Sequence, residues 1–430
     1  MHRVWTIPML SVALVLAALG GLVGPGQAQP VEIEFWYGLG GFLGQTVERI
    51  IQEFNESQNE VKVIGIAQAD YDETMQKLQA AIAAGVAPAA VLMNQNEAVA
   101  LARRGIFTPL DEYIAADPTV DLDDYIEAFT NVTNLDGRQY SLPLYGTTQV
   151  LYYRHDMFKD AGIDADSALD TWEGLAEAAA KLTRWDGNNV VVYGWEPMWG
   201  EGNMVDSAQS RGLRILSEDG TKVQIDSPGW IETWESFRRW LHDEKIMRIH
   251  HGGIGWEYWY RTIADVLEGR AAGYTGSSGD QGDLDFTIVS AHPQPAWQGH
   301  TPAPSATAKH GMIPEQVPEE KKRAAFKWLA FFTSPEKTAD WSMSTGYIGV
   351  RKSARVVPTF QAYVEANPHA LVPLLQAETA IPEFLDPTGS DIWNALSDAA
   401  DQVQIENIPA RQALQRAARI AQRALDRVLR

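Results

Sequence analysis

Aromatic side chains are the residues of this sequence whose type and placement could do chemistry. They fall in or beside irregular segments, off regular core stripes, at Trp36, Tyr37, Trp195, Trp199, Trp256, Tyr258, Trp259, Tyr260 and Trp297. Their flat faces suit the C–H faces of sugar rings, and nearby hydroxyls and amides suit the hydroxyls of a sugar. The pattern therefore predicts a site for a sugar or polyol, with three or four of these nine side chains in contact with it.

The sequence patterns that mark catalytic, metal and nucleotide sites are missing. There is no G-x-x-x-x-G-K-[ST] and no H-E-x-x-H, and residues 276–279 miss the G-x-S-x-G spacing by one position. The glycine-rich residues 38–44 lack the third glycine of a dinucleotide site, which favours a ligand-contacting loop at a helix start. His250 and His251 are adjacent, so their side chains point apart, and we interpret them as exposed. We expect no catalytic residue, cofactor or metal.

Residues 142–162, LPLYGTTQVLYYRHDMFKDAG, contain a predicted strand, turn and helix in one run. Val150 to Tyr153 is a β-prone block, preceded by a predicted turn at Gly146-Thr147-Thr148. A helix is predicted from Asp156 to Gly162. Since open α/β sheets bind small ligands at strand ends, we expect the Thr147 turn to face a solute.

Strands and helices alternate through the first hundred residues. Strands are predicted at 31–37, 61–66 and 89–93, and helices at 43–54, 71–84 and 98–103. This order predicts a mostly parallel sheet with helices on both faces. Farther along, helices are predicted at 163–182, 228–244 and 319–332, and strands at 271–278 and 286–290, before a helical tail from 358.

The return of strands near residue 271 predicts that the chain goes back to its first sheet, so that two lobes form. We expect an α/β protein in which each lobe is a mostly parallel sheet flanked by helices. The predicted limits are 29–140 plus 273–330 for lobe 1 and 141–272 plus 331–430 for lobe 2. Several strands crossing between the lobes would act as a hinge that closes around a ligand.

The first 28 residues are predicted to be a secretory signal. His2 and Arg3 form a short basic start, residues 7–23 are apolar, and Gln27-Ala28 offers a cleavage site. The alternative is a single membrane anchor, which Pro8 and the glycines of the segment disfavour. The chain has no cysteine, so disulfides and the cysteine-linked bacterial lipid anchor are excluded. We therefore expect a freely diffusing periplasmic protein.

The charge of the chain excludes some partners. A formal net charge of −21 argues against nucleic acid, because phosphate contacts need clustered Lys and Arg. The one basic run is the predicted helix at 409–430, which carries six Arg. Its apolar positions follow helical spacing, so a solvated structural helix is favoured over contact with a membrane surface.

Residues 142–162 also resemble the "LP…LYYN.D.F..AG" segment of the extracellular solute-binding proteins of ABC importers, in the group that binds sugars and glycerol-3-phosphate. The resemblance continues through Thr171-Trp172-Glu173-Gly174-Leu175, Ser334-Pro335-Glu336 and Thr345-Gly346-Tyr347, with Arg154 in place of the family's Asn. It implies a two-lobed periplasmic-binding-protein fold, type II-like, a membrane permease driven by an ATPase as partners, and a monomer.

The resemblance also implies site residues, position by position. In the opening strand Trp36 keeps the family's residue and Tyr37 stands where the family has a His, and the family's ligand Tyr matches Tyr71. The family's Glu falls on Gln95, which keeps hydrogen bonding but drops the charge, and its Ser falls on Thr147. Ser277, Ser278 and Tyr347 match the family's residues. The family's phosphate-binding Arg falls on or near Trp393, so a phosphate loses a charge-assisted partner there. Arg351 or Arg261 could replace it.

The sequence therefore favours a neutral or weakly charged sugar or polyol, stacked by Trp393 and one of Trp195 or Trp199. Glycerol-3-phosphate or a glycerophosphodiester is the alternative ligand. A secreted carbohydrate-active enzyme, with two carboxylates facing each other across the cleft, is the alternative of another class. A binding protein that serves a chemoreceptor is a third possibility.

Overall fold

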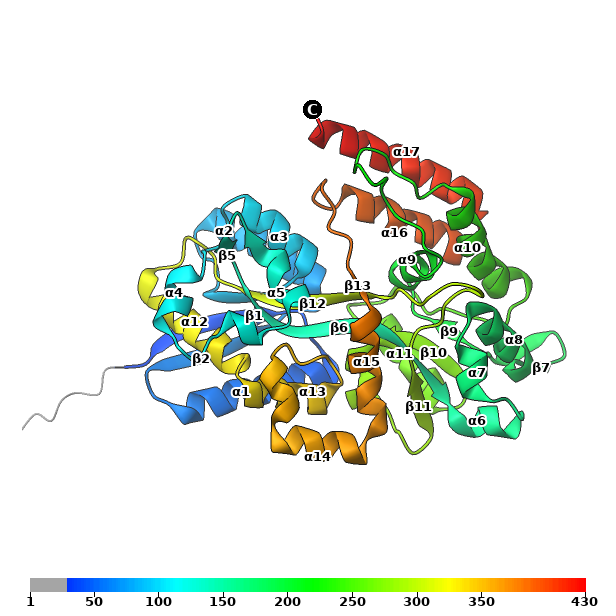
Figure 1. Ribbon diagram of the computed structural model, residues 1–430, viewed down its shortest axis with the longest axis horizontal. Helices are drawn as coiled ribbons and strands as arrows, with labels where there is room; N and C mark the ends of the chain where they lie inside the picture. Colours follow the sequence, from blue (N-terminus) through cyan, green and yellow to red (C-terminus); the bar gives the residue numbers. More distant parts are fainter. Residues whose placement is uncertain (1–28) are drawn as a thin grey trace, which may run out of the picture.

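The computed structural model describes residues 29–430, and the predicted secretory signal lies outside this range. Two lobes lie side by side and share strand β6, Leu142–Arg154 (Figure 1). The strands pair in the order β2-β1-β3-β12-β6-β10-β9, with β11 also on β6 and β13 on β12. The two-lobed α/β fold that the sequence predicts is confirmed. No helix within the described range is long and apolar enough to span a membrane.

Lobe 1 is built on the predicted β-α-β-α-β unit. Its strands are β1 (Val31–Tyr37), β2 (Val61–Ala67), β3 (Ala90–Asn94) and β12 (Ser305–Met312), and its main helices are α1 (Gly41–Ser57), α2 (Tyr71–Ala84), α3 (Gln95–Arg103), α12 (Glu319–Phe332) and α13 (Pro335–Thr345). Side chains of β3 alternate between the two faces of the sheet. Ala90 and Leu92 pack in the cluster with α1 and α12, and Val91 and Met93 pack with α2 and α3.

Lobe 2 has a smaller sheet and more helix. Its strands are β9 (Glu196–Pro197), β10 (Gly273–Ser277) and β11 (Val289–His292), with the hairpin β7 (Arg184–Asp186) and β8 (Asn189–Val192) apart. Its helices are α6 (His155–Asp160), α7 (Ala165–Leu169), α8 (Trp172–Leu182), α9 (Gly202–Gln209), α10 (Pro228–Arg238), α11 (Glu257–Leu267), α16 (Asp391–Gln404) and α17 (Ala410–Val428). β10 and β11 run antiparallel to β6.

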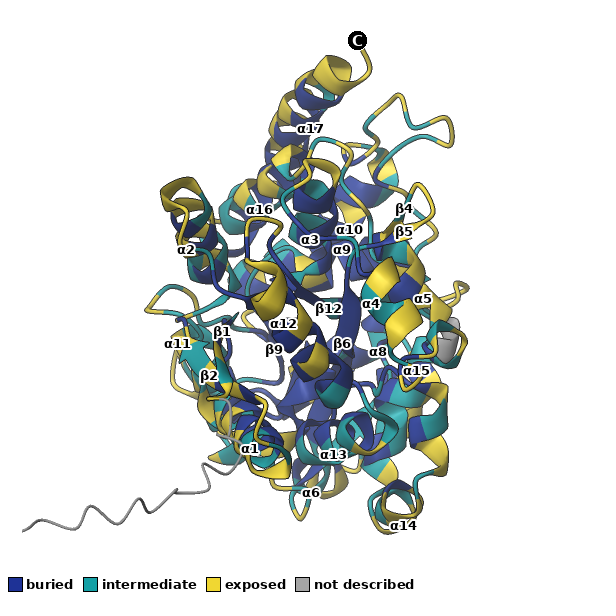
Figure 2. Cartoon of the chain, turned by 90° about the vertical axis from the view of Figure 1, so that its left-hand side faces the viewer, coloured by how far each residue is buried: buried dark blue, intermediate teal, exposed yellow. Residues whose placement is uncertain are grey.

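Several short elements complete the chain. Lobe 1 carries α4 (Asp111–Ala116), α5 (Glu127–Thr130), β4 (Asn134–Leu135) and β5 (Arg138–Gln139), and the tail carries α14 (Pro358–Ala366), α15 (Val372–Thr379) and β13 (Ile381–Pro382). Figure 2 shows β6 largely buried at the centre and exposed residues on outer helices such as α14.

Two local predictions are wrong. The predicted turn at Gly146-Thr147-Thr148 is part of β6, because these residues pair in register with Ala308, Thr307 and Ala306 of β12. The single helix predicted over 163–182 is two helices. Thr171 begins the second one, since its hydroxyl accepts a hydrogen bond from the backbone N–H of Gly174 at 3.0 Å.

The hydrophobic clusters indicate which residues belong to each lobe. β10 and β11 pack in the lobe 2 cluster with Val150 and Tyr152, whereas Trp341 of α13 packs in the lobe 1 cluster with Tyr145. We therefore propose that lobe 1 takes residues 29–148 and 305–350 and that lobe 2 takes 149–304 and 391–430. The chain then crosses between the lobes along β6, before β12, and through the tail around β13.

A glycine in lobe 2 gives the first prediction. A Cβ on the buried Gly194 would overlap the backbone carbonyl of Ala179 in α8. Gly194→Ala is therefore expected to lower the free energy of unfolding by about 2–4 kcal/mol, because two backbone segments must move apart. Urea unfolding measures this. Gly202→Ala is the matched control, since the described residues leave open space there, and an equal loss in the control would contradict the prediction.

Candidate functional site

A pocket of about 350 Å³ lies between the two lobes. Lobe 1 contributes Leu39, Gly40, Leu43, Tyr71, Asn94, Thr147, Thr307, Lys309 and Tyr347, and lobe 2 contributes Gln149, Glu201, Trp256, Trp259, Tyr260, Ser277, Asp280 and Asp283, with Glu383 from the tail after β13. Thr147 and Gln149 are two residues apart on β6, so their side chains share the face that lines the pocket, which therefore sits where the shared strand passes between the lobes.

The aromatic wall of the pocket comes mainly from the start of α11. The indole of Trp256 lies edge-to-face against Tyr71 of lobe 1, with ring centroids 5.9 Å apart, and its Nε1 donates to the Gly38 carbonyl at 3.4 Å. Trp259 and Tyr260 follow on the same helix. Trp256 thus touches both the pocket and the opposite lobe, so its contacts depend on how the lobes approach each other.

Asp280 is a buried carboxyl in the lobe 2 wall. It accepts hydrogen bonds from Trp259 Nε1 at 2.8 Å and from the Tyr274 hydroxyl at 3.1 Å. Burial outweighs these bonds and raises the pKa of Asp280 to about 8. Burial also raises the pKa of Asp283 and of Glu201, which line the same pocket.

Lys309 is the cationic side chain of the pocket wall. Its Nζ donates to Asn94 Oδ1 at 2.8 Å and lies 5.0 Å from the centre of the Tyr71 ring. Burial lowers the pKa of Lys309, and the charges of Glu383 and Glu97 oppose that shift. Glu383 accepts from Asn96 Nδ2 at 3.0 Å and from the Thr307 hydroxyl at 3.2 Å, and burial raises its pKa to about 7.

Four of the predicted site residues line this pocket: Tyr71, Thr147, Ser277 and Tyr347. The hydroxyls of Thr147 and Ser277 lie 3.2 Å apart across the two lobes. Ser278 is buried behind them, where its hydroxyl accepts from the Thr148 backbone at 3.4 Å. Gln95 is buried next to the lining residue Asn94, and its side-chain oxygen has no partner within the described residues.

The other predicted aromatic residues lie outside the pocket wall. Trp36 donates to Glu34 at 2.9 Å, and the hydroxyl of Tyr37 donates to Glu48. Trp195 is buried in lobe 2, where its Nε1 donates a hydrogen bond to the Thr275 hydroxyl at 3.0 Å.

Trp199 and Trp393 are likewise engaged elsewhere. Trp199 donates to Asp401 at 2.6 Å, and Trp393 donates to the Phe384 carbonyl at 3.2 Å and packs on the lobe 2 cluster. In place of the predicted stack of Trp393 with Trp195 or Trp199, the structure brings Trp256 and Trp259 to the pocket. The indole of Trp195 cannot reach it because the core encloses that side chain.

The two arginines considered as replacement phosphate ligands are also outside the pocket wall. Arg351 is buried and pairs with Asp124 at 2.6 Å, and Arg261 is exposed and pairs with Glu257 at 3.1 Å. Within the described residues, the pocket wall contains no Arg. The sequence prediction also missed Lys309, Glu383, Asp280 and Asp283. One signal in the sequence could have indicated Asp280 and Asp283: they directly follow the predicted strand 271–278, which ends beside the predicted site residue Ser277.

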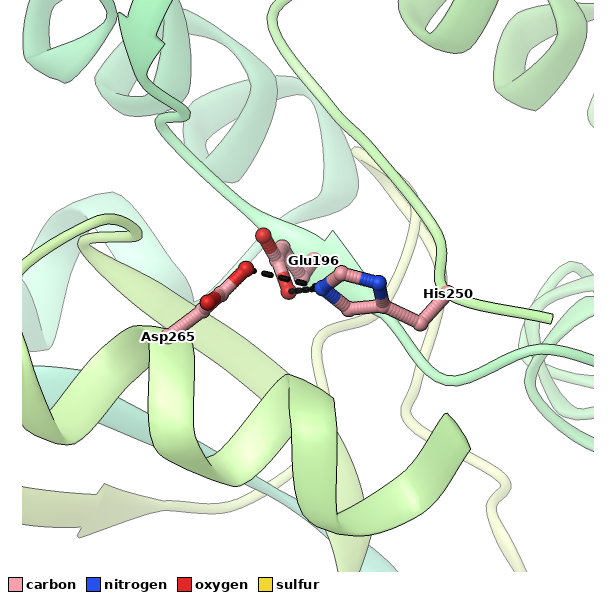
Figure 3. Close-up of side chains that lie close together, drawn as sticks. All are labelled: Glu196, His250 and Asp265. Atoms are coloured by element: carbon pink, nitrogen blue, oxygen red, sulfur yellow. Dashed lines mark hydrogen bonds and ion pairs between the residues drawn. The ribbon is translucent and has the colours of Figure 1, made fainter. Parts of the chain in front are cut away.

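Glu196, His250 and Asp265 form a second cluster of polar side chains in lobe 2 (Figure 3). His250 Nε2 lies 2.8 Å from Asp265, so the prediction that His250 is an exposed histidine is wrong. Arg248 pairs with both carboxylates and Arg270 pairs with Asp265. Because the guanidinium groups of Arg248 and Arg270 already contact the two carboxyl groups, we interpret the cluster as an ion-pair network rather than a metal site.

Two α/β lobes that share a strand and enclose a ligand-sized pocket define a solute-binding protein of the periplasmic type. Residues 49–368 match the bacterial extracellular solute-binding proteins, and the chain belongs to this family. It is the extracytoplasmic solute-binding component of an ABC importer, as the sequence predicts, and members of the family are binding proteins.

The chain is similar to two proteins named as sn-glycerol-3-phosphate-binding periplasmic protein UgpB. It is 24% identical over 358 residues to that of Yersinia pestis, covering 79% of this chain and 78% of the relative. It is 25% identical over 366 residues to that of Escherichia coli K12, covering 81% of each.

Two solved structures share the fold. UgpB from Mycobacterium tuberculosis, in complex with glycerophosphocholine, has a TM-score of 0.82 at 23% identity, over 94% of this chain and 100% of that one. An ABC substrate-binding protein from Listeria monocytogenes, in complex with cycloalternan, has a TM-score of 0.80 at 20% identity, over 93% and 100%. At such identities the likeness shows the fold alone.

Proposed function

We propose that this protein captures a hydroxyl-rich sugar or polyol without a free phosphate monoester and delivers it to the permease of its importer. The observation that carries the proposal is the charge of the pocket wall. It holds the carboxyl groups of Glu201, Asp280, Asp283 and Glu383 against the single ammonium of Lys309. A doubly charged phosphate would meet repulsion from each of these carboxyl groups that is ionised, and this repulsion grows as the pH rises past the pKa of about 7 of Glu383 and of about 8 of Asp280.

Hydrogen-bonding capacity supports the same class of solute. Gln149 lines the pocket, and its buried side-chain oxygen has no partner within the described residues. An unpaired buried acceptor is costly and favours a ligand that donates hydrogen bonds. A sugar hydroxyl can donate, whereas a fully ionised phosphate only accepts. The rings of Trp256 and Trp259 would then contact the C–H faces of the sugar.

Binding without catalysis is part of the proposal. The side chains that could serve as an acid pair are held by other groups: Trp259 and Tyr274 donate to Asp280, and Asn96 and Thr307 donate to Glu383. We expect any bound oligosaccharide to be recovered intact after prolonged incubation with the protein.

A glycerophosphodiester is the second candidate solute. Lys309 supports it, because one ammonium can pair with the single charge of a phosphodiester. The first turn of α1 adds to this, since Gly40 lines the pocket and no side chain caps the helix. The relatives named for glycerol-3-phosphate and the neighbour solved with glycerophosphocholine favour the same chemistry.

Mass spectrometry of the ligand released from purified protein, followed by calorimetry, tests the proposal. The calorimetry panel contains mono- and disaccharides, glycerol-3-phosphate and glycerophosphodiesters. We expect saccharides to bind and Lys309→Gln to change their affinity by less than about threefold, because a neutral solute needs no cation. A phosphodiester should lose about tenfold or more in this variant. Tight binding of glycerol-3-phosphate with no response to any sugar would overturn the proposal.

A further inference from the structure

Helix α17 forms an outer edge of lobe 2, where its apolar face packs on α16 and α10 (Figure 1). Its opposite face is basic. Residues 409–430 hold six Arg and one acidic residue, whereas the rest of the chain holds 29 basic and 55 acidic residues. This helix is therefore a local reversal of the charge of the protein.

Four of these arginines line up. At about 100° per residue, Arg416, Arg419, Arg423 and Arg427 fall within a sector of about 80° that extends about 17 Å along the helix. All four are exposed. Arg427 pairs with Asp391 at 2.9 Å, and no ion pair to Arg416, Arg419 or Arg423 occurs within residues 29–430. We call these four residues the arginine stripe.

Apart from Arg427, which lies in the last turn and pairs with Asp391, the arginine stripe does not serve the stability of the helix. Arg416 and Arg419 are three residues apart, and Arg419, Arg423 and Arg427 follow at intervals of four, so each faces a like charge on the next turn. Such pairs are unfavourable in an isolated helix. Because the arginines repel one another along the helix and three of the four have no ion pair within residues 29–430, the stripe fits an anionic surface outside the molecule.

Apolar side chains beside the stripe indicate which kind of surface. Ile420 lies at its margin, and Val428 and Leu429, which are more than half exposed, lie at the end of α17. Because the main apolar face of α17 packs on α16 and α10, only these three apolar side chains can enter a lipid headgroup region, beside a basic face of the kind that helices on lipid surfaces carry. The guanidinium groups pair with lipid phosphates, and the apolar side chains enter the headgroup boundary.

We propose that the arginine stripe of α17 docks this protein on an anionic phospholipid surface, which would hold it close to the membrane where its permease lies. The net negative charge of the whole chain does not prevent this. Interactions between exposed charges are screened beyond about 8 Å at physiological ionic strength, so the bilayer meets mainly the charges of the helix that faces it.

Co-sedimentation of the exported protein with vesicles tests the proposal. We expect binding to vesicles of phosphatidylglycerol and phosphatidylcholine in equal parts, loss of that binding as NaCl is raised, and no binding to pure phosphatidylcholine. Combined Arg416→Gln, Arg419→Gln and Arg423→Gln should lower the partition coefficient by about 100-fold, or roughly fivefold for each Arg. Lys at the same three positions should keep most of the binding.

The matched control removes the same charge elsewhere. Arg103, Arg104 and Arg355 are exposed in lobe 1 and the tail, so their triple change to Gln should leave vesicle binding within about twofold of the parent. Equal loss in both variants, no binding by the parent, or equal binding to pure phosphatidylcholine would overturn the proposal. Retention on immobilised polyglutamate without vesicle binding would also overturn it and indicate an acidic protein partner.

Discussion

Replacing Trp256 with alanine is expected to lower the affinity of the protein for its solute by about 30–100-fold. The indole contributes flat surface to the pocket and also contacts Tyr71 and the Gly38 carbonyl of the opposite lobe. Truncation of a large aromatic side chain at the centre of an interface costs about 2–3 kcal/mol. Calorimetry with the solute identified from the purified protein measures the change.

Trp393→Phe is the matched control for Trp256. Trp393 was predicted from the sequence to stack on the solute, but it packs against lobe 2 and donates to the Phe384 carbonyl. We expect unchanged affinity and a loss of about 1 kcal/mol in the free energy of unfolding, because the variant removes one hydrogen bond. Loss of affinity in this variant with none in Trp256→Ala would contradict the site described above.

The alternation of strands and helices in lobe 1 could be predicted because each element has a local signal. Val31–Tyr37 and Glu319–Phe332 have the bounds that the sequence predicted. The sequence alone could not show that the prediction of a turn at Gly146 is wrong. Gly-Thr-Thr is a turn by local preference, and pairing with β12, more than 150 residues later, extends it into a strand.

The site was predictable where a local motif fixes a residue and unpredictable where the tertiary fold does. The family resemblance identifies Tyr71 at the start of α2, Ser277 at the end of β10 and Tyr347 just after α13, and it also identifies Thr147, which lies within β6. The choice among tryptophans depends on which irregular segment reaches the cleft. The segment around Trp256 lies against lobe 1, where a Cβ on Gly255 would approach the Ala69 carbonyl to 2.9 Å. No local pattern in the sequence encodes that contact.

The charged residues of the pocket illustrate the same limit. Lys309 lies in β12. The face of the sheet from which its side chain projects is set by the register of β12 with β3, in which Lys309 pairs with Asn94. Glu383 reaches the pocket because β13 pairs with the start of β12. A shift of one residue in either pairing would turn these side chains to the other face. The balance of charge in the pocket therefore emerges only from the assembled sheet.

Buried carboxyl groups with raised pKa values make the stability of the protein depend on pH. Burial raises the pKa of Asp280 to about 8 and of Glu196 to about 7. A carboxyl with a raised pKa binds its proton more tightly in the folded chain than in the unfolded chain. The free energy of unfolding therefore falls as the pH rises toward the folded pKa. Glu383, with a pKa of about 7, acts in the same direction.

Buried histidines act in the opposite direction at lower pH. Burial lowers the pKa of His310 to about 3 and of His250 to about 4, so the unfolded chain binds more protons than the folded chain below pH 6.5. Their contribution to the free energy of unfolding rises with pH up to about 6.5 and is constant above it. Between pH 4 and 6.5 the two kinds of group therefore oppose each other, and above pH 6.5 the carboxyl groups act without the histidines.

The protein is therefore expected to lose about 2–3 kcal/mol of unfolding free energy between pH 6.5 and 8, since each carboxyl that remains protonated in the fold contributes about 1.4 kcal/mol per pH unit. Urea unfolding at fixed ionic strength across this range measures the loss. Asp280→Asn should remove about half of it, because the amide has the same shape and no titrating proton and its oxygen still accepts from Trp259, while Glu196 and Glu383 supply the rest. Stability that rises from pH 6.5 to 8, or an equal loss in Asp280→Asn, would show that Asp280 is ionised in the folded protein at neutral pH. The acidic wall of the pocket would then carry its full charge, and the exclusion of phosphate monoesters would be stronger still.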